Sequence, residues 1–128
     1  MPSRFNGTCL ITRDVPGLAA FYAEVLDSEV SGSEVFATVT VTGAVLSFFA
    51  AGSMEQMVPG CLEGAGSGNF TLEFEVDDVD ACHERLRERY TIVKPPTSQA
   101  WGRRSVWLRD PDGNIVNLYR NVPAPQEA

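Results

Sequence analysis

The chain has 128 residues, a net charge of −7 and an ordinary globular composition, with 44% hydrophobic and 21% charged residues. This length suits one domain, which can bury about two-thirds of the surface of its unfolded chain. The acidic charge argues against a nucleic-acid partner, whose phosphates it would repel, and favours a neutral or cationic ligand. No apolar run reaches the roughly 18 residues of a membrane span, and the start, MPSRFNG, lacks the apolar stretch of a secretory signal.

The cysteines indicate a reducing compartment. Cys9, Cys61 and Cys82 are odd in number and match no metal-binding spacing. We therefore expect reduced thiols in a cytoplasmic protein.

The first half of the chain predicts a strand, a helix and three further strands. Residues 8–26 read TCLITRDVPGLAAFYAEVL: an alternating strand that reaches Asp14-Val15 and continues as an amphipathic helix. Asp14 can cap the first turn of that helix. Three strand-like runs follow, at approximately residues 28–36, 37–42 and 44–50. A two-residue turn at Thr42-Gly43 would place Phe36 opposite Phe49 and Thr38 opposite Ser47.

The second half repeats this pattern at an offset of 64 residues, with Asp78-Val79 matching Asp14-Val15. Residues 71–90, TLEFEVDDVDACHERLRERY, again predict a strand and a helix, and the strands that follow are expected near 91–94, 104–109 and 114–120. Residues 52–69 hold five glycines and predict a loop between the halves. The apolar stripes of the two helices are expected in the core: Val15, Leu18, Tyr22 and Leu26 in the first, and Val79, Cys82, Leu86 and Tyr90 in the second.

A strong turn signal closes the second half. Residues 107–120 read WLRDPDGNIVNLYR, in which Pro111 and Gly113 interrupt two apolar runs. This stretch and the repeated Asp-Val helices resemble the vicinal-oxygen-chelate superfamily of glyoxalases, bleomycin-resistance-type proteins and extradiol dioxygenases. The resemblance covers nearly the whole chain. It implies an α+β fold in which two βαβββ modules form a curved antiparallel sheet with a cleft, and the helices pack on the outer side. We expect one domain over 1–128, with a first module at about 1–55, a linker at about 56–68 and a second module at about 69–122.

The resemblance also places the metal. Metal-dependent members use four ligands, two per module, drawn from His, Gln or Glu. Counting from the motifs puts the equivalent positions at Gly7, Ser47, Thr71 and Asn117. None is an imidazole, carboxylate or thiolate, so we expect neither a metal nor another cofactor. The only histidine, His83, is expected on the second helix, away from the cleft.

Strand alternation assigns the side chains that would line the cleft. We expect a ligand-binding set with an aromatic floor, hydroxyl and amide groups in place of the metal, and a loop tryptophan as a lid: Cys9, Phe36, Thr38, Ser47, Phe49, Thr71, Glu73, Trp101, Asn117 and Tyr119. Two alternatives stay open for Trp101, packing on its own scaffold or in a subunit interface. A bulge near the turn could place Trp107 on either face of the sheet, so the sequence does not assign its face.

The pattern resembles the metal-free, bleomycin-resistance-type branch, which implies a homodimer that sequesters an aromatic natural product or antibiotic without changing it. We expect no nucleic-acid or membrane partner. One alternative is an enzyme: a glyoxalase-like protein whose metal site the counting missed, or a cofactor-free isomerase, cyclase or hydrolase using Glu73 or Tyr119. The other is a structural or regulatory module without a small ligand.

Overall fold

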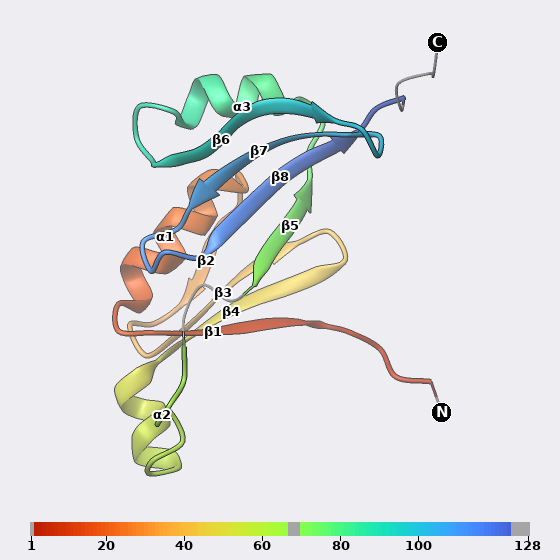
Figure 1. Ribbon diagram of the computed structural model, residues 1–128. Coiled ribbons are helices and arrows are strands. Elements are labelled where there is room, and N and C mark those ends of the chain that lie inside the picture. Colours follow the sequence, from red (N-terminus) through yellow and green to blue (C-terminus); the bar gives the residue numbers. More distant parts are fainter. Residues whose placement is uncertain (1, 67–69, 124–128) are drawn as a thin grey trace. The chain divides into compact units, whose positions relative to one another are not determined.

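The computed structural model describes residues 2–66 and 70–123, and the chain divides into two compact units, Met1–Ala65 and Gly66–Ala128 (Figure 1). We call these the first and second modules. The end of the linker expected at 56–68 and the start of the module expected near 69 fall on residues outside the described ranges. No helix in the described part of the chain is long and apolar enough to cross a membrane.

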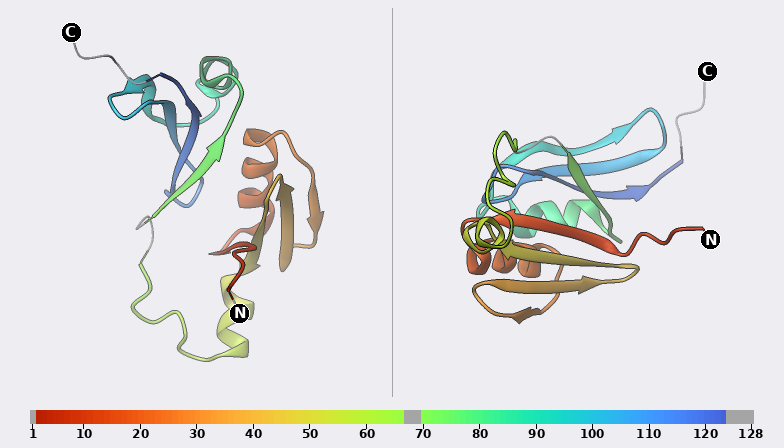
Figure 2. Two further views of the ribbon diagram at one scale, coloured as in Figure 1. Left: turned by 90° about the vertical axis from the view of Figure 1, so that its right-hand side faces the viewer. Right: turned by 90° about the horizontal axis from the view of Figure 1, so that it is seen from below.

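The first module is one sheet of mixed direction with a helix packed on it. Its elements are β1 (Gly7–Thr12), α1 (Val15–Val25), β2 (Val30–Gly32), β3 (Phe36–Val41), β4 (Ala44–Ala50) and α2 (Ala51–Met57). The strand order is β1-β4-β3-β2. Helix α1 packs against β2, β3 and β4, on one face of this sheet (Figure 2).

The second module repeats this arrangement. Its elements are β5 (Thr71–Glu75), α3 (Val79–Leu86), β6 (Ile92–Gln99), β7 (Arg103–Arg109) and β8 (Ile115–Asn121). The strand order is β5-β8-β7-β6, and α3 packs against β6, β7 and β8. The α+β fold with two βαβββ modules is therefore confirmed.

The sheets differ from the expected antiparallel sheet in one respect, because each is mixed. β1 pairs with β4, and β5 with β8, in the parallel direction, while the remaining pairs are antiparallel. The reason is topological. The helix carries the chain from the first strand to the opposite edge of the sheet, and the three antiparallel strands that follow lead back until the last one lies beside the first and runs in the same direction.

Both helices begin where the repeated aspartates predict. The carboxylate of Asp14 accepts a hydrogen bond from the amide of Gly17 at 3.0 Å, and that of Asp78 accepts one from Ala81 at 3.0 Å. These bonds satisfy amides of the first helical turn that have no partner within the helix.

The helical stripes form most of the expected core. In α1, Val15, Leu18 and Tyr22 are fully buried, and Tyr22 packs on Phe48 of β4 with ring centroids 5.6 Å apart. In α3, Val79 and Leu86 are fully buried. Leu26 and Tyr90, the last residues of the expected stripes, are only partly buried because they follow the ends of α1 and α3. Cys82, within α3, is also only partly buried.

Three boundaries differ from the sequence expectation. The stretch predicted as loop begins with a helix, α2, which ends before Pro59 and packs on β4. β2 is shorter than expected because Gly32 turns the chain with a φ of 125°. β6 is longer than expected. It passes through Pro95 and Pro96 with shifts of register, which an edge strand tolerates because its outer amides need no ladder partner.

Candidate functional site

The first module carries a row of small polar side chains on the sheet face opposite α1. Ser47 of β4 lies in register with Cys9 of β1 on one side and Thr38 of β3 on the other. Alternation along β4 points Phe48 toward the helix and Ser47 and Phe49 away from it. The predicted pair of Thr38 and Ser47 is confirmed, and the row offers hydroxyl and thiol groups to a ligand.

An aromatic pair lies beside this row. Phe36 and Phe49 are opposite each other in register, as the Thr42-Gly43 turn predicts, with ring centroids 6.2 Å apart and an interplanar angle of 67°. Phe36 is 46% exposed although it is large and apolar. A half-exposed edge-to-face pair next to hydroxyl groups suits contact with a ring that bears polar substituents.

The second module carries a polar row on the face opposite α3. Asn117 of β8 lies in register with Glu73 of β5 and with Trp107 of β7. Tyr119 occupies the same face two residues further along β8, opposite Ser105 of β7. The structure therefore places Trp107 on the same sheet face as Asn117, and the irregularities of register lie in β6 rather than at the turn after β7.

Glu73 is the centre of a hydrogen-bonded network on this face. Its Oε2 accepts hydrogen bonds from Asn117 Nδ2 and from Arg103 Nη1, both at 3.1 Å. The Arg103 guanidinium also lies over the ring of Tyr119, 3.8 Å from its centroid. The side chains of Arg103 and Glu73 are 33% and 49% exposed, so water weakens the ion pair but the geometry still fixes the carboxylate.

Glu75 is separate from this network. It lies two residues beyond Glu73 on β5, and its Oε2 accepts a hydrogen bond from Asn121 Nδ2 at 3.3 Å. Glu73 and Glu75 are both exposed. Because each carboxylate has its own partner, the two are separate charges on one strand face rather than a catalytic carboxylate pair.

Three buried side-chain atoms in the described chain have no hydrogen-bond partner: Gln99 Nε2, Trp107 Nε1 and Asn117 Oδ1. Such atoms are uncommon in folded proteins, where nearly all buried polar groups are paired. Two of the three belong to the facing residues Trp107 and Asn117, in the middle of the candidate site.

Trp101 lies in the turn between β6 and β7, and 70% of it is exposed. This exposure does not agree with the alternative in which the indole packs on its own scaffold. An exposed indole is compatible with two roles, as a lid over a ligand or as part of a subunit interface. The turn is anchored by the amide of Gly102, which donates to the carbonyl of Gln99 at 3.1 Å.

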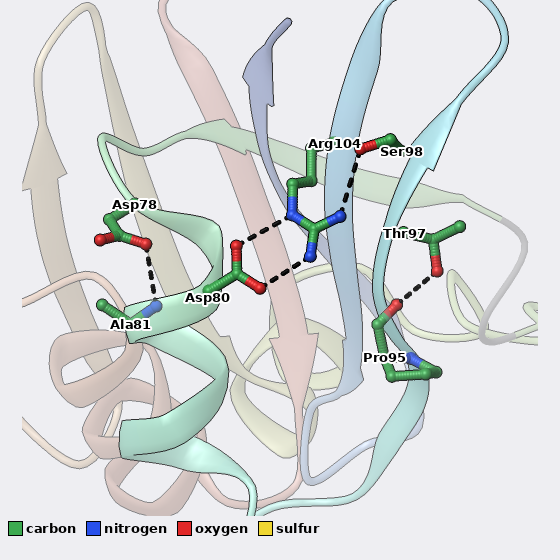
Figure 3. Close-up of polar contacts among 7 residues, drawn as sticks. All are labelled: Asp78, Asp80, Ala81, Pro95, Thr97, Ser98 and Arg104. Carbon is green, nitrogen blue, oxygen red and sulfur yellow. Dashed lines mark hydrogen bonds and ion pairs between the residues drawn. The ribbon is translucent and has the colours of Figure 1, made fainter.

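An ion pair holds the strands next to this turn against α3. Arg104 donates from Nε and Nη2 to the two carboxylate oxygens of Asp80, at 2.9 and 2.7 Å, and from Nη1 to Ser98 at 3.2 Å (Figure 3). The hydrogen bonds from Arg104 lower the pKa of the Asp80 carboxyl, and Asp80 raises the pKa of the guanidinium. The pair lies on the helix side of the sheet, so it positions the hairpin that carries Arg103 without touching the candidate site.

The residues at the four metal positions do not fit a metal ion. Gly7 has no donor, and any side chain there would run into the backbone carbonyl of Val45. Ser47 and Thr71 offer only neutral hydroxyls, and the amide nitrogen of Asn117 is directed at Glu73. Within the described residues no group of three or more His, Cys, Asp or Glu side chains could hold an ion. His83 lies in α3, which packs on the other face of the sheet from Asn117.

A match to a family model shows the class of protein to which this fold belongs. The profile of the Glyoxalase/Bleomycin resistance protein/Dioxygenase superfamily matches residues 4–118, so the chain belongs to this superfamily. A curated relative, the uncharacterized protein YraH of Bacillus subtilis (strain 168), is 36% identical over 61 residues, or 46% of this chain and 48% of that protein. The match thus spans about half the length of that relative.

Solved structures show the same fold. A glyoxalase/bleomycin resistance protein/dioxygenase family enzyme from Burkholderia phytofirmans PsJN is 21% identical with a TM-score of 0.82, covering 94% of this chain and 100% of that chain. A lactoylglutathione lyase from Agrobacterium tumefaciens is 22% identical with a TM-score of 0.73, covering 94% and 95%.

The sequence predicts one ligand-binding set, of which the structure brings part together within each module, and two further residues share the face of the second group. Cys9, Thr38 and Ser47 lie together in the first module, as Glu73, Asn117 and Tyr119 do in the second. Arg103 and Trp107 were missed as site residues. Arg103, Ser105 and Trp107 are two residues apart along β7, which indicates that they share one face of the sheet. That this face also carries Asn117 follows only from the register of β7 with β8.

Proposed function

We propose that this protein binds a flat, partly apolar small molecule without a metal ion and releases it chemically unchanged. The observation that carries the proposal is the donor set at the four metal positions: Gly7, Ser47, Thr71 and Asn117. In place of an electrophile, this set offers hydroxyl and amide groups that pair with oxygen and nitrogen atoms of a ligand. Without such pairing, burial of those ligand atoms would be costly.

The apolar part of a ligand would contact aromatic side chains, which each module carries on its helix-free sheet face. Phe36 and Phe49 supply an edge-to-face pair in the first module, and Tyr119 and Trp107 lie on the corresponding face of the second. Trp101 would add a stacking surface from its exposed turn. The net charge of −7 favours neutral or cationic compounds over anions.

Within the superfamily, this combination corresponds to the bleomycin-resistance-type proteins, so an aromatic natural product or antibiotic is the proposed ligand class. Sequestration is the proposed role, in a homodimer, as in those proteins. Exposed aromatic side chains support a subunit contact, because Phe5 and Trp101 are 77% and 70% exposed. The odd number of cysteines favours the cytoplasm.

An enzymatic function is the second candidate. One similar structure is a lactoylglutathione lyase, and Glu73 offers a carboxylate on the candidate face. Two bonds already engage Oε2 of Glu73, which favours a role in holding Asn117 and Arg103 over proton transfer to or from a substrate. A cofactor-free isomerase, cyclase or hydrolase would need that carboxylate to be released.

A thermal-shift screen against a panel of natural products tests the proposal. A ligand present at about 100 times its dissociation constant adds roughly 2.7 kcal/mol to the free energy of unfolding. Hits are then titrated by calorimetry and recovered for mass analysis. An unchanged ligand with stoichiometric binding supports sequestration, whereas a chemically changed ligand would establish an enzyme.

Two matched comparisons sharpen this experiment. Glu73→Gln should leave binding of a neutral ligand nearly unchanged, whereas an enzyme that uses Glu73 as a base would lose turnover. Elemental analysis and EDTA treatment address the metal directly. We expect no stoichiometric transition metal and an unchanged melting temperature, and one tightly held ion per chain would contradict the proposal.

A further inference from the structure

Two residues that lie opposite each other on β7 and β8 each carry a buried polar atom without a partner. Trp107 and Asn117 are opposite in register, and both Trp107 Nε1 and Asn117 Oδ1 are buried without a hydrogen-bond partner. Directly opposite residues of an antiparallel pair have side chains about 5 Å apart on one face. An indole N–H only donates and an amide oxygen only accepts, so the two atoms form a complementary pair.

The orientation of the Asn117 amide is fixed by its neighbours. Only 8% of Asn117 is exposed, and its Nδ2 donates to Glu73 Oε2 at 3.1 Å. Arg103 binds the same carboxylate oxygen, so the acceptor of that bond is itself held in place. Because Nδ2 and Oδ1 diverge from the same carbon, the bond to Glu73 turns Oδ1 away from β5 and leaves it as a free acceptor.

The surroundings suit a ring. Lys94 Nζ lies 5.3 Å from the ring centroid of Trp107, and Arg103 covers the ring of Tyr119 at 3.8 Å. Both cations are the ends of long, flexible side chains. A flat ligand can therefore reach the Trp107 ring by displacing the end of Lys94 rather than backbone, while Arg103 stays bound to Glu73.

We propose that Trp107 and Asn117 together recognise the cis-amide edge of a flat ring, the adjacent C=O and N–H of a lactam or cyclic imide. Trp107 Nε1 donates to the carbonyl oxygen, and Asn117 Oδ1 accepts from the ring N–H. The inference rests on the proposed binding function and names the chemical class that this module selects. A buried water that bridges the two atoms is the competing explanation.

The test uses two probes of nearly the same shape. 2-Quinolone carries the cis-amide edge, and coumarin keeps the carbonyl but has a ring oxygen in place of the N–H. Coumarin would leave Asn117 Oδ1 unpaired and facing a second acceptor. By calorimetric titration we expect 2-quinolone to bind about 5- to 150-fold more tightly than coumarin, the range that corresponds to one buried unsatisfied group.

Nuclear magnetic resonance locates the contact. The chain has two tryptophans, so Trp101→Phe assigns both indole N–H signals. 2-Quinolone should shift the Trp107 indole signal strongly in wild type and in Trp101→Phe. Trp107→Phe should weaken binding of 2-quinolone and of coumarin by a similar factor, about 5-fold or more, because both lose the donor to the carbonyl. The preference for 2-quinolone over coumarin should persist in this variant, because Asn117 still supplies the acceptor.

Several results would overturn the inference. These are equal affinity for the two probes, no binding of either at millimolar concentration, or a Trp107 indole signal that stays unchanged and shows contact with a long-lived water. The wild-type comparison of probes stands even if Trp107→Phe fails to fold. If the natural-product panel yields a ligand while both probes fail, the proposed function survives and only the cis-amide recognition is lost.

Discussion

Arg103 is the residue whose removal tests the network around Glu73 most directly. Arg103→Met keeps an apolar stem beside Tyr119 but removes the ion pair with Glu73 and the cation–π contact at 3.8 Å. A pair as exposed as this one is worth about 0.2–1 kcal/mol, and an exposed cation–π contact about 0.5–1 kcal/mol. We therefore expect Arg103→Met to lower the free energy of unfolding by about 0.7–2 kcal/mol. Glu73→Gln, which loses only the ion pair, should cost about 0.2–1 kcal/mol.

Urea denaturation of the wild type, the two single variants and the double variant gives the coupling between the residues. The coupling should be about 0.2–1 kcal/mol and should shrink in molar salt, because an exposed pair is screened. Arg103→Lys is the matched control, since it keeps the charge but loses the planar group over Tyr119. Strict additivity of the single variants at low salt would refute the ion pair, and with it the role of Arg103 in holding the Glu73 carboxylate.

Three further predictions follow from burial and charge. Trp101→Ala should change the free energy of unfolding by no more than about 0.5 kcal/mol, because the indole is 70% exposed. It should weaken ligand binding, measured by calorimetry, about tenfold, and equal affinity would remove Trp101 from the site. Phe48→Ala should cost about 3–5 kcal/mol in urea denaturation, and the half-exposed Phe36→Ala much less; equal losses would contradict the assigned faces of the sheet. Arg104 lowers the pKa of Asp80, so the pair stabilises the fold above the unfolded-state pKa and is lost as pH falls through the folded-state pKa. Asp80→Asn should therefore melt below wild type at neutral pH and converge with it in acid, and a gap that persists in acid would be inconsistent with this linkage.

The sequence predicted the features that depend on residues close together in the chain. Asp14 and Asp78 cap their helices through amides three residues ahead, so the repeat alone indicated where both helices begin. The turn at Thr42-Gly43 fixed the register of β3 and β4, and with it the pairs of Phe36 with Phe49 and Thr38 with Ser47.

The sequence did not predict helix α2 or the full length of β6, because nearby residues favoured a different local structure. Five glycines in 52–69 favoured a loop, yet the first seven residues after β4 have only one glycine and form α2 against that strand. Pro95 and Pro96 argued for the end of a strand. Strand β6 continues through them because it lies at the edge of the sheet, and edge position is a property of the whole topology.

By itself, then, the sequence determined the two βαβββ modules, their helix starts and one hairpin register. The assignment of Gly7, Ser47, Thr71 and Asn117 to the metal positions came from the resemblance to the superfamily and stays a prediction. Only the tertiary structure decided that Arg103 and Asn117 both bind Glu73 and that Trp107 faces Asn117. The partners of Glu73 are 30 and 44 residues away in the chain. Their meeting follows from the parallel pairing of β5 with β8 and the antiparallel pairing of β7 with β8. No residue near Glu73 in the sequence specifies those pairings, because strand order is set by how the whole sheet buries its apolar face against α3.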